Sequence, residues 1–370
     1  MEFSTTLQRW YAAHGRTLPW RGISDPYRIW LSEVILQQTR VEQGRAYYER
    51  FTREFPTVEA LAAATEREVL ATWQGLGYYT RARNLHKAAK AIAAAGAFPN
   101  TYEALRALPG VGDYTASAVA SLAYGLPYAV VDGNVYRVLA RYFGLSTPID
   151  TTAGKHEFKA LATRLLDPQH SAEHNQAMMD FGATVCTPRT PRCTDCPLSN
   201  GCAMLAEGCN PEQFPFKARR IQVSMRHFTY VMLRRQGQWL LHRRQAGDIW
   251  QGLYEPLLFE SDQPFSPDEV QQSLQRTLAI GPHEGTFRQV ATGMRHQLTH
   301  RLILAEAYLL DLGDAPTTLP EGCVWVSGEE LAEYPVPRLV ERLFCIATET
   351  LQTPHNHTTD DTQEETATPA

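Results

Sequence analysis

The sequence has no apolar run close to the roughly 20 residues that a membrane-spanning helix requires. Its first residues, MEFSTTLQRW, also lack the basic start and the following apolar stretch that are typical of a secretory signal. From both absences we expect a soluble protein that stays in the cytoplasm and makes no contact with a membrane.

Cysteine is scarce outside one short segment. Four of the 7 cysteines follow the spacing C-x6-C-x2-C-x5-C, and they are Cys186, Cys193, Cys196 and Cys202. The other three are scattered, which disfavours a disulfide framework and indicates a reducing compartment. Four thiolates on a short loop suit a single inorganic centre, and the spacing alone leaves a [4Fe-4S] cluster and a tetrahedral zinc ion both open.

A net positive charge is also missing. The formal charge is -5, with net +2 over residues 1–209, net -3 over residues 210–353 and net -4 over the remaining residues. The charge balance therefore gives no sign of a polyanionic partner, and any inference about nucleic acid must rest on local geometry.

The length of 370 residues and the change in apolar pattern indicate two domains. Helical periodicity dominates the first part, as in RARNLHKAAKAIAAAG, and predicts an all-α domain at residues 1–209. Residues 210–225 are expected to be a linker. Short branched and aromatic runs such as FTYVMLRR and QWLLHRR then predict an α+β domain at residues 226–350. The polar residues 351–370 are expected to be a disordered tail.

A glycine-containing turn lies between two helical stretches, in LPGVGDYTASAVA. Gly110 and Gly112 permit a positive φ angle and a close approach of the backbone to a ligand. The helix expected to start near Asp113 would point its free N–H groups and its positive dipole end outward. The segment therefore predicts a site for an anion such as a DNA phosphate, although a plain interhelical turn has the same pattern.

Two carboxylates stand in unusual contexts. Glu33 is the only acid in PYRIWLSEVILQQTRV, and apolar surroundings would raise its pKa and keep it protonated near neutral pH. The alternative is a solvent-facing glutamate on an amphipathic helix. Asp132 ends an apolar run in VVDGNVYRV and is expected to cap the helix that follows.

The turn followed by the four-cysteine loop resembles the endonuclease III superfamily of DNA glycosylases over nearly all of residues 5–206. This resemblance implies a helix-hairpin-helix domain, one [4Fe-4S] cluster on the four cysteines, and Asp132 as the carboxylate that stabilises an oxocarbenium-like sugar. The segment SEVILQQT is similar to that of MutY-type adenine DNA glycosylases in particular. That similarity implies that Glu33 is the general acid.

The same resemblance gives a role to Tyr114. Superfamily members that also cut the strand use a lysine in the second helix of the hairpin, and Tyr114 stands in its place. We therefore expect a largely monofunctional enzyme without an amine nucleophile. Tyr114 is similar to a tyrosine that assists catalysis in some MutY proteins, and Asn134 resembles a supporting asparagine.

A glycosylase must extrude its target base, fill the gap and read the base. Three segments match MutY motifs for these tasks: RTLPWR, NQAMMDFG, and QQT with GLGYYTRARN. Core packing is the ordinary alternative for their aromatic residues. The resemblance implies the following DNA contacts: Arg16, Leu18, Trp20, Arg21, Gln38, Tyr78 and Gln176, together with Gly110 and Gly112 of the hairpin.

The second domain resembles the opening of a Nudix domain in QWLLHRRQAGDIWQGLYEPLLF. It lacks the glutamate pattern that holds metal in Nudix hydrolases, so we expect neither a metal nor pyrophosphatase activity. In MutY proteins such a domain contacts 8-oxoguanine through a Phe-Ser-His loop, and here that loop would be Leu298, Thr299 and His300. A metal site on His296 and His300 is disfavoured, because no acid lies nearby in sequence.

These observations predict a base-excision repair enzyme that removes adenine mispaired with 8-oxoguanine or guanine in double-stranded DNA. We expect a monomer in a bacterial cytoplasm, associated with the nucleoid. Two alternatives stay open from the sequence: a bifunctional glycosylase/lyase for oxidised pyrimidines, and a non-catalytic iron-sulfur protein that binds DNA.

Overall fold

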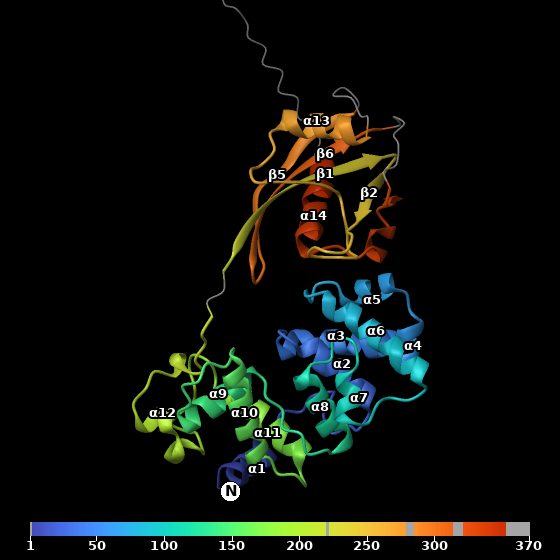
Figure 1. Ribbon diagram of the computed structural model, residues 1–370. Helices are drawn as coiled ribbons and strands as arrows, with labels where there is room; N and C mark the ends of the chain where they lie inside the picture. Colours follow the sequence, from blue (N-terminus) through green and yellow to red (C-terminus); the bar gives the residue numbers. More distant parts are fainter. Residues whose placement is uncertain (1, 220–221, 279–284, 314–320, 353–370) are drawn as a thin grey trace, which may run out of the picture. The chain divides into compact units, whose positions relative to one another are not determined.

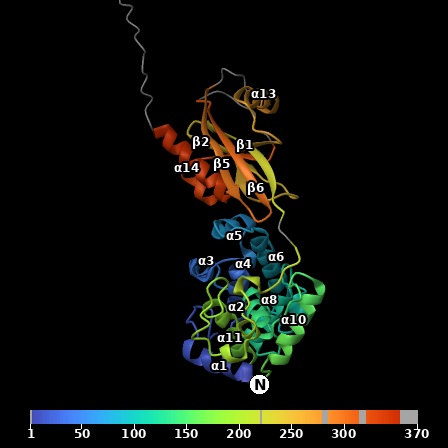
Figure 2. The same ribbon diagram turned by 90° about the vertical axis from the view of Figure 1, so that its left-hand side faces the viewer.

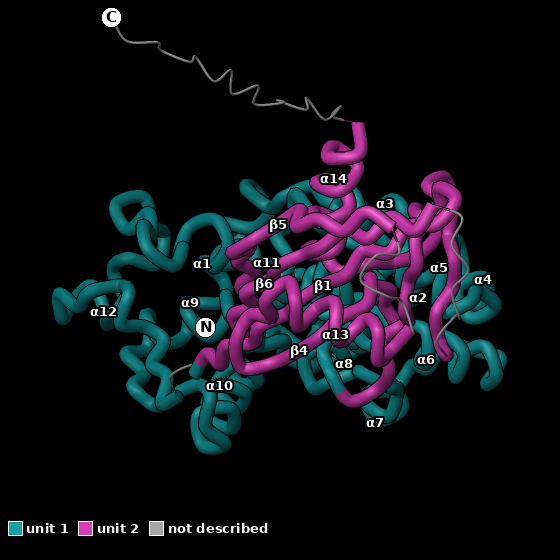
Figure 3. Tube along the Cα trace, turned by 90° about the horizontal axis from the view of Figure 1, so that it is seen from above, with its two compact units in different colours: residues 1–222, 248–251 teal, residues 223–247, 252–370 magenta. Residues whose placement is uncertain are grey.

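The computed structural model describes residues 2–219, 222–278, 285–313 and 321–352. The chain divides into two compact units (Figures 1 and 3), of which the first contains residues 1–222 and 248–251 and the second contains residues 223–247 and 252–370. Among the described residues, no helix is both long and apolar enough to cross a membrane.

The first unit is built from α-helices joined by short turns, as the sequence predicted. Its helices are α1 (Glu2–His14), α2 (Pro26–Leu36), α3 (Val41–Glu54), α4 (Val58–Ala63), α5 (Glu66–Trp73), α6 (Thr80–Ala95), α7 (Tyr102–Arg106), α8 (Asp113–Tyr124), α9 (Gly133–Phe143), α10 (Thr152–Leu165), α11 (Ser171–Thr184) and α12 (Ala203–Ala206), with 3-10 turns η1 (Ser199–Gly201) and η2 (Pro211–Gln213).

Helix α2 lies in the interior of this unit. The carboxylate of Asp25 caps it by accepting hydrogen bonds from the backbone N–H groups of Tyr27 and Arg28, and Pro26 occupies the first turn, where a missing N–H costs nothing. Every residue from Tyr27 to Ile35 except Arg28 is buried. A helix that is apolar on all sides is expected to be a core helix, so a polar group on α2 is shielded from water.

The first helix of the chain packs against much later ones. Phe3 and Leu7 of α1 share a hydrophobic core with residues of α9, α10 and α11, and the four closely spaced cysteines pack against this same core. Figure 1 shows α1 beside α11, which is more than 150 residues away in sequence. This core holds α9 and α11, the helices that carry Asp132 and Gln176.

The second unit contains a seven-stranded mixed sheet among its described residues, with the order β3-β2-β1-β6-β5, while β4 pairs with β1 and β7 pairs with β2. Only β1 and β6 run parallel within these pairs. Its strands and helices are β1 (Ser224–Arg235), β2 (Gln238–Arg243), β3 (Tyr254–Glu255), β4 (Leu257–Ser261), α13 (Pro267–Leu278), β5 (Thr286–Gln297), β6 (Arg301–Asp311), β7 (Cys323–Val326), η3 (Glu330–Glu333) and α14 (Arg338–Gln352).

A helix covers each face of this sheet, as Figure 2 shows. Val231 and Leu233 of β1 share a core cluster with Val270 of α13. On the other face, the ring of Trp239 packs edge-on against Phe344 of α14, at 5.4 Å between ring centroids. Because side chains alternate between faces along a strand, burial on both sides explains why β1 reads as a nearly continuous apolar run. The α+β prediction is confirmed.

Strand β5 was not expected from the sequence. It lies at the edge of the sheet, is polar and half-exposed along most of its length, and is interrupted by register shifts between Gln289 and Met294. A polar edge strand with bulges has no period-two apolar pattern, so composition gives little sign of it.

The segment predicted to be a linker, residues 210–225, is partly tied to the first unit. The backbone N–H of Ile149 donates to the carbonyl of Phe216, and the carboxylate of Asp150 accepts from the backbone N–H groups of Ala218 and Arg219. Of the predicted disordered tail at residues 351–370, residues 353–370 lie outside the described part of the chain.

The second unit contains a buried ion pair whose loss has a predictable cost. Arg244 Nη1 lies 2.6 Å from Glu255 Oε1, and the hydroxyl of buried Tyr230 donates to Glu255 Oε2. Glu255→Ala would leave the guanidinium buried without its carboxylate and should lower the free energy of unfolding by about 3–5 kcal/mol, measured by urea denaturation of the full chain.

Glu260→Ala is the matched control, because Glu260 pairs with Arg226 while its own side chain is 40% exposed. Its cost should stay below about 1 kcal/mol. Equal losses in the two variants would contradict the assignment of the Arg244–Glu255 pair as a buried, coupled pair.

Candidate active site and DNA-facing surface

Glu33 lies on α2 with only 6% of its surface exposed. Burial raises the pKa of its carboxyl to about 7, and the charge of Asp132 acts in the same direction. A hydrogen bond from Tyr114 and the charge of Arg21 oppose this rise. The expectation of a shielded carboxyl, rather than a solvent-facing one, is confirmed, while its role as a general acid stays a prediction.

Tyr114, in the first turn of α8, is the direct partner of Glu33. Its hydroxyl donates to Glu33 Oε2 at 2.5 Å and lies 3.8 Å from the sulfur of Met179 on α11. Burial, followed by the charges of Glu33 and Asp132, raises the pKa of Tyr114 well above its usual value, so the phenol keeps its proton. Tyr114 is therefore a hydrogen-bond donor to the carboxyl of Glu33.

Asp132 is the N-cap of α9, as the sequence predicted. Its Oδ1 accepts from the backbone N–H groups of Asn134 and Val135 at 2.9 and 2.8 Å, and its Oδ2 accepts from Asn134 Nδ2 at 2.7 Å. Burial raises the pKa of Asp132, and these hydrogen bonds counteract that rise because they favour the charged form. The N-cap role and a role in chemistry are compatible at this position.

Helix α9 connects Asp132 to the cysteine segment. Arg137 donates from Nε to the carbonyl of Cys186 at 2.7 Å and from Nη2 to Asn134 Oδ1 at 2.9 Å. One turn later, Arg141 is 1% exposed and donates from Nη1 to the carbonyl of Thr187 at 2.7 Å and to Cys186 Sγ at 3.4 Å. Sequence reasoning missed both arginines, because the i, i+4 pair also matches an ordinary helix face.

The four cysteines of the C-x6-C-x2-C-x5-C segment are free, partly buried thiols. Burial raises the pKa of Cys196 to about 11, and Cys186, Cys202 and Cys193 each add to the rise, which indicates that the four sulfurs are neighbours. Among the described residues, however, no group of three or more His, Cys, Asp or Glu side chains meets the geometry of a metal site. The all-sulfur donor set fits an iron-sulfur cluster chemically and does not exclude zinc.

Arg16 and Arg21 meet on one carboxylate that sequence reasoning missed. Asp180 of α11 is fully buried, and its oxygens accept from Arg16 Nη2 at 2.6 Å and from Arg21 Nη1 and Nη2 at 2.5 Å. Arg21 is close enough to Glu33 to affect its pKa. The only sequence signal for Asp180 is its position one helical turn after Gln176.

The remaining residues expected to read the base differ in exposure. Gln176 is half-buried, and its Oε1 accepts from the hydroxyl of Tyr11 at 2.7 Å. Leu18 and Trp20 are each 7% exposed, and the Trp20 ring packs edge-on against Tyr48. Their contact with a base stays a prediction, since both are mainly part of the core in this structure.

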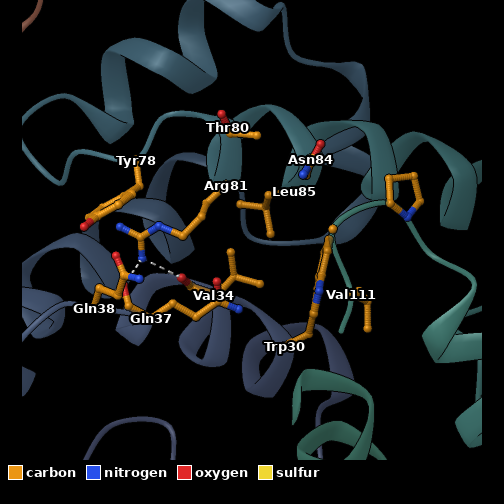
Figure 4. Close-up of a pocket in the computed structure, with 12 residues that line it drawn as sticks. Trp30, Val34, Gln37, Gln38, Tyr78, Thr80, Arg81, Asn84, Leu85 and Val111 are labelled. Atoms are coloured by element: carbon orange, nitrogen blue, oxygen red, sulfur yellow. Dashed lines mark hydrogen bonds between the residues drawn. The ribbon is translucent and has the colours of Figure 1, made fainter. Parts of the chain in front are cut away.

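Gln38 and Tyr78 line a cleft of about 270 Å³ between the end of α2, the start of α6 and the hairpin (Figure 4). Both residues have positive φ angles, 57° and 49°, which are uncommon for residues other than glycine and frequent at functional sites. Tyr78 is 49% exposed whereas Tyr79 is 7% exposed. Of the two adjacent tyrosines, only Tyr78 is available to enter a base stack.

Arg81 organises this cleft, although the sequence did not identify it. Its Nη1 donates to the carbonyls of Val34, Ile35 and Gln37 at the end of α2, and its guanidinium lies over the ring of Tyr78 at 5.6 Å. Burial lowers the pKa of Arg81 to about 10, so it remains charged at neutral pH. One cation thus connects the helix of Glu33 to the segments of Gln38 and Tyr78.

The two glycines of the hairpin differ in backbone conformation. Gly110 has a φ of +75°, and a Cβ there would approach Asn84 Cβ to 2.5 Å. Gly112 has an extended backbone with φ -89°, so it does not use the positive φ that glycine permits. A Cβ at Gly112 would contact nothing within 4 Å, which leaves the backbone N–H groups at the start of α8 open to approach.

In the second unit, Leu298, Thr299 and His300 form the turn between β5 and β6. The backbone N–H of Leu298 donates to the carbonyl of Arg301 at 2.8 Å and closes the turn. Thr299 and His300 are exposed, whereas Leu298 is half-buried. Neither His296 nor His300 belongs to a metal-holding group in the described part of the chain.

The hydrogen bond from Tyr114 stabilises the charged form of Glu33, so Tyr114→Phe should raise the Glu33 pKa above about 7. The measurement is a pH titration of ¹³C-labelled glutamate carboxyls by NMR, with Glu33→Gln assigning the signal. Tyr124→Phe, at the other end of α8, is the control and should leave the titration unchanged. A Glu33 midpoint that falls in Tyr114→Phe would refute the assigned direction of this hydrogen bond.

Comparison with known proteins agrees with this arrangement. Residues 31–164 match the family described as HhH-GPD superfamily base excision DNA repair protein, and residues 229–345 match the NUDIX domain. An adenine DNA glycosylase of Homo sapiens is 33% identical over 403 residues, which cover 93% of this chain and 73% of that protein. An adenine DNA glycosylase of Buchnera aphidicola subsp. Acyrthosiphon pisum is 32% identical over 68% of this chain and 73% of its own length.

A solved thermostable thymine-DNA glycosylase is 31% identical, has a TM-score of 0.52, and matches 56% of this chain and 96% of its own. The two family matches cover the helical unit and the sheet unit in turn. Together with the identity to adenine DNA glycosylases over most of the chain, they place this protein in that family: the chain belongs to the adenine DNA glycosylases, which are enzymes of base excision repair.

Proposed function

We propose that this enzyme hydrolyses the N-glycosidic bond of adenine mispaired with 8-oxoguanine or guanine in double-stranded DNA. The observation that carries the proposal is the buried pair of Glu33 and Tyr114, with Asp132 close enough to affect both pKa values. Glycosidic bond cleavage needs a proton for the leaving group and a carboxylate for the positively charged sugar, and the two acids match these two needs.

In this mechanism, Glu33 carries the proton to the leaving adenine. Its pKa of about 7 is suited to that task, because a general acid works best when its pKa lies near the working pH. Tyr114 holds the carboxyl in one orientation through its hydroxyl. Asp132 stabilises the oxocarbenium-like sugar, and Asn134 together with two backbone N–H groups favours its charged form.

The enzyme is expected to leave the abasic strand largely intact. Tyr114 is not a nucleophilic amine, and it stands where a lyase has lysine. Lys159, on the neighbouring α10, donates to Ser117 Oγ at 2.9 Å and to the carbonyl of Ala129 at 2.6 Å, so its ammonium group is already engaged. The proposed reaction is therefore hydrolysis without a Schiff base.

Base extrusion is assigned to the cleft. Exposed Tyr78 and adjacent Gln38 would enter the stack, while the extruded adenine would meet Arg21 and Gln176 near Glu33. The other residues assigned to base or backbone contact are Arg16, Leu18, Trp20, Gly110 and Gly112. The two glycines would approach a phosphate at the open N-terminus of α8.

The turn of Leu298, Thr299 and His300 is proposed to contact 8-oxoguanine opposite the adenine. Exposed Thr299 retains a hydroxyl for hydrogen bonding, and Leu298 supplies apolar bulk. This loop differs from Phe-Ser-His at two of its three residues, so the preference for 8-oxoguanine over guanine is to be measured directly.

We further propose that Cys186, Cys193, Cys196 and Cys202 hold one [4Fe-4S] cluster. Bound there, the cluster would cross-link the loop after α11 through its thiolates. Arg137 and Arg141 already tie this loop to the helix of Asp132, and Arg192 donates to the carbonyl of Thr184 at the end of α11. Arg189 and Arg192 within the loop would then contact the DNA backbone.

A single-turnover assay on end-labelled duplexes tests the reaction. Duplexes with adenine opposite 8-oxoguanine or guanine should be cleaved at adenine only after alkali, whereas adenine opposite thymine and thymine glycol opposite adenine should stay intact. The ratio of the first two rates measures the 8-oxoguanine preference. Cleavage of thymine glycol without alkali would instead favour a bifunctional glycosylase/lyase.

In the same assay, the rate should fall as pH rises through about 7, because Glu33 then loses the proton that it must donate. Glu33→Gln should reduce the rate by about 10²–10⁴-fold, the usual contribution of a general acid. Glu42→Gln, an exposed glutamate on α3, is the control and should match the unchanged enzyme. Full activity in Glu33→Gln would contradict the role of Glu33 as the general acid.

The cluster proposal is tested by metal and sulfide content. The purified protein should contain iron and acid-labile sulfide in equal amounts, and Cys196→Ser should lose both and bind duplex DNA more weakly. Cys345→Ser, an exposed cysteine of the second unit, should change neither. Zinc in place of iron would contradict the proposed cluster. Unchanged DNA affinity in Cys196→Ser would show that the cysteine loop does not contribute to DNA binding.

A further inference from the structure

The side chain of Asp180 accepts several hydrogen bonds that neither the proposed reaction nor the family match explains. Its side chain is fully buried and receives the backbone N–H of Arg16 at 3.0 Å, Arg16 Nε at 2.9 Å and Nη2 at 2.6 Å. Arg21 donates both terminal nitrogens, at 2.5 Å each. A single carboxylate therefore fixes two guanidiniums and the backbone of the segment that precedes α2.

Arg21 extends this contact towards Glu33. Its Nη1 also donates to the carbonyl of Arg16 at 3.0 Å, and its guanidinium lies over the Tyr11 ring at 5.8 Å. Tyr11 in turn donates to Gln176, one helical turn before Asp180. With Asp180 in place, part of the positive charge near Glu33 is neutralised by a carboxylate that is itself fully buried.

The charged and titratable groups that act on Glu33 come from three directions. Tyr114 faces it from α8, Asp132 from the start of α9, and Arg21 from the segment before α2. Asp180 is paired with Arg16 and Arg21, and Tyr11 lies beside this cluster with exposed Glu173 farther along its edge. Asp180 therefore contacts Arg21, which acts on Glu33, and its hydrogen bonds go to Arg16 and Arg21 rather than to Glu33.

We propose that Asp180 is a positioning residue that fixes the guanidiniums of Arg16 and Arg21 beside the extruded base and screens Glu33 from the charge of Arg21. This inference rests on the proposed role of Glu33 as general acid. Asp180 is then a second buried carboxylate of the site, on α11. Its charge affects the pKa of Glu33, while its own atoms take no part in bond cleavage.

The isosteric change Asp180→Asn removes the charge and keeps the shape. Arg21 then acts on Glu33 without compensation, the ionised form of Glu33 gains stability, and its pKa falls. The descending limb of the single-turnover rate against pH should move down by about one pH unit, the size expected for one unscreened charge at an effective protein dielectric constant of about 20. At pH values above both midpoints, the rate should be about tenfold lower than in the unchanged enzyme.

Three further variants extend this test, and those that retain a carboxylate at position 180 keep it decisive if Asp180→Asn folds poorly. Arg21→Gln removes the positive charge and should move the same limb to higher pH. The double variant Asp180→Asn with Arg21→Gln removes both charges and should return the limb towards its original position, because their effects on Glu33 have opposite signs. Asp180→Glu restores the carboxylate and should return the limb towards its original position.

Glu173→Gln is the matched control, since it removes a negative charge from an exposed position on the same helix and should leave the limb in place. A uniform loss of rate in Asp180→Asn with an unshifted limb would overturn the proposal and leave a structural role. Glu33→Gln is run beside these variants to test the general-acid mechanism separately. If Glu33 is not the general acid, Glu33→Gln will retain full activity.

Discussion

The burial of one carboxyl group, that of Glu33, is the constraint on which the rest of the helical unit depends. Helix α2 is apolar on almost every side and Glu33 is only 6% exposed, so its carboxyl is largely shielded from water. The fold supplies the phenol of Tyr114 and the charge of Arg21 in place of water. Neither group fully offsets the loss of hydration of the charged carboxylate. The carboxyl consequently keeps its proton at a pH where most glutamates have lost theirs.

The other ionisable groups near this carboxyl are held by helices from distant parts of the chain. Asp132 is oriented because it is an N-cap, and its helix then runs on to Arg137 and Arg141, which hold the backbone of the cysteine segment. Asp180 plays the corresponding part on α11 by orienting two arginines. Capping and ion pairing, which are ordinary means of stabilising a fold, thus place the charged groups of the candidate site.

Much of the fold was readable in the sequence because it follows local periodicity. The helical half and the apolar strands β1 and β2 were predicted, whereas most of polar, bulged β5 was missed for lack of any period-two pattern. The burial of Glu33 and the capping role of Asp132 followed from their neighbours in sequence. Of the two glycines that permit a positive φ, only Gly110 adopts one, since the extended backbone of Gly112 is enough to begin α8.

The sequence by itself determined the residue types of the candidate site and their local settings: an isolated acid in an apolar helix, a tyrosine that follows the hairpin glycines, and four closely spaced cysteines. Only the tertiary structure decided which of them meet. Tyr114 reaches Glu33 across 81 residues, and Arg16 and Arg21 reach Asp180 across 164 and 159 residues. Such contacts depend on how whole helices pack, and no periodicity along the chain records which faces will come together.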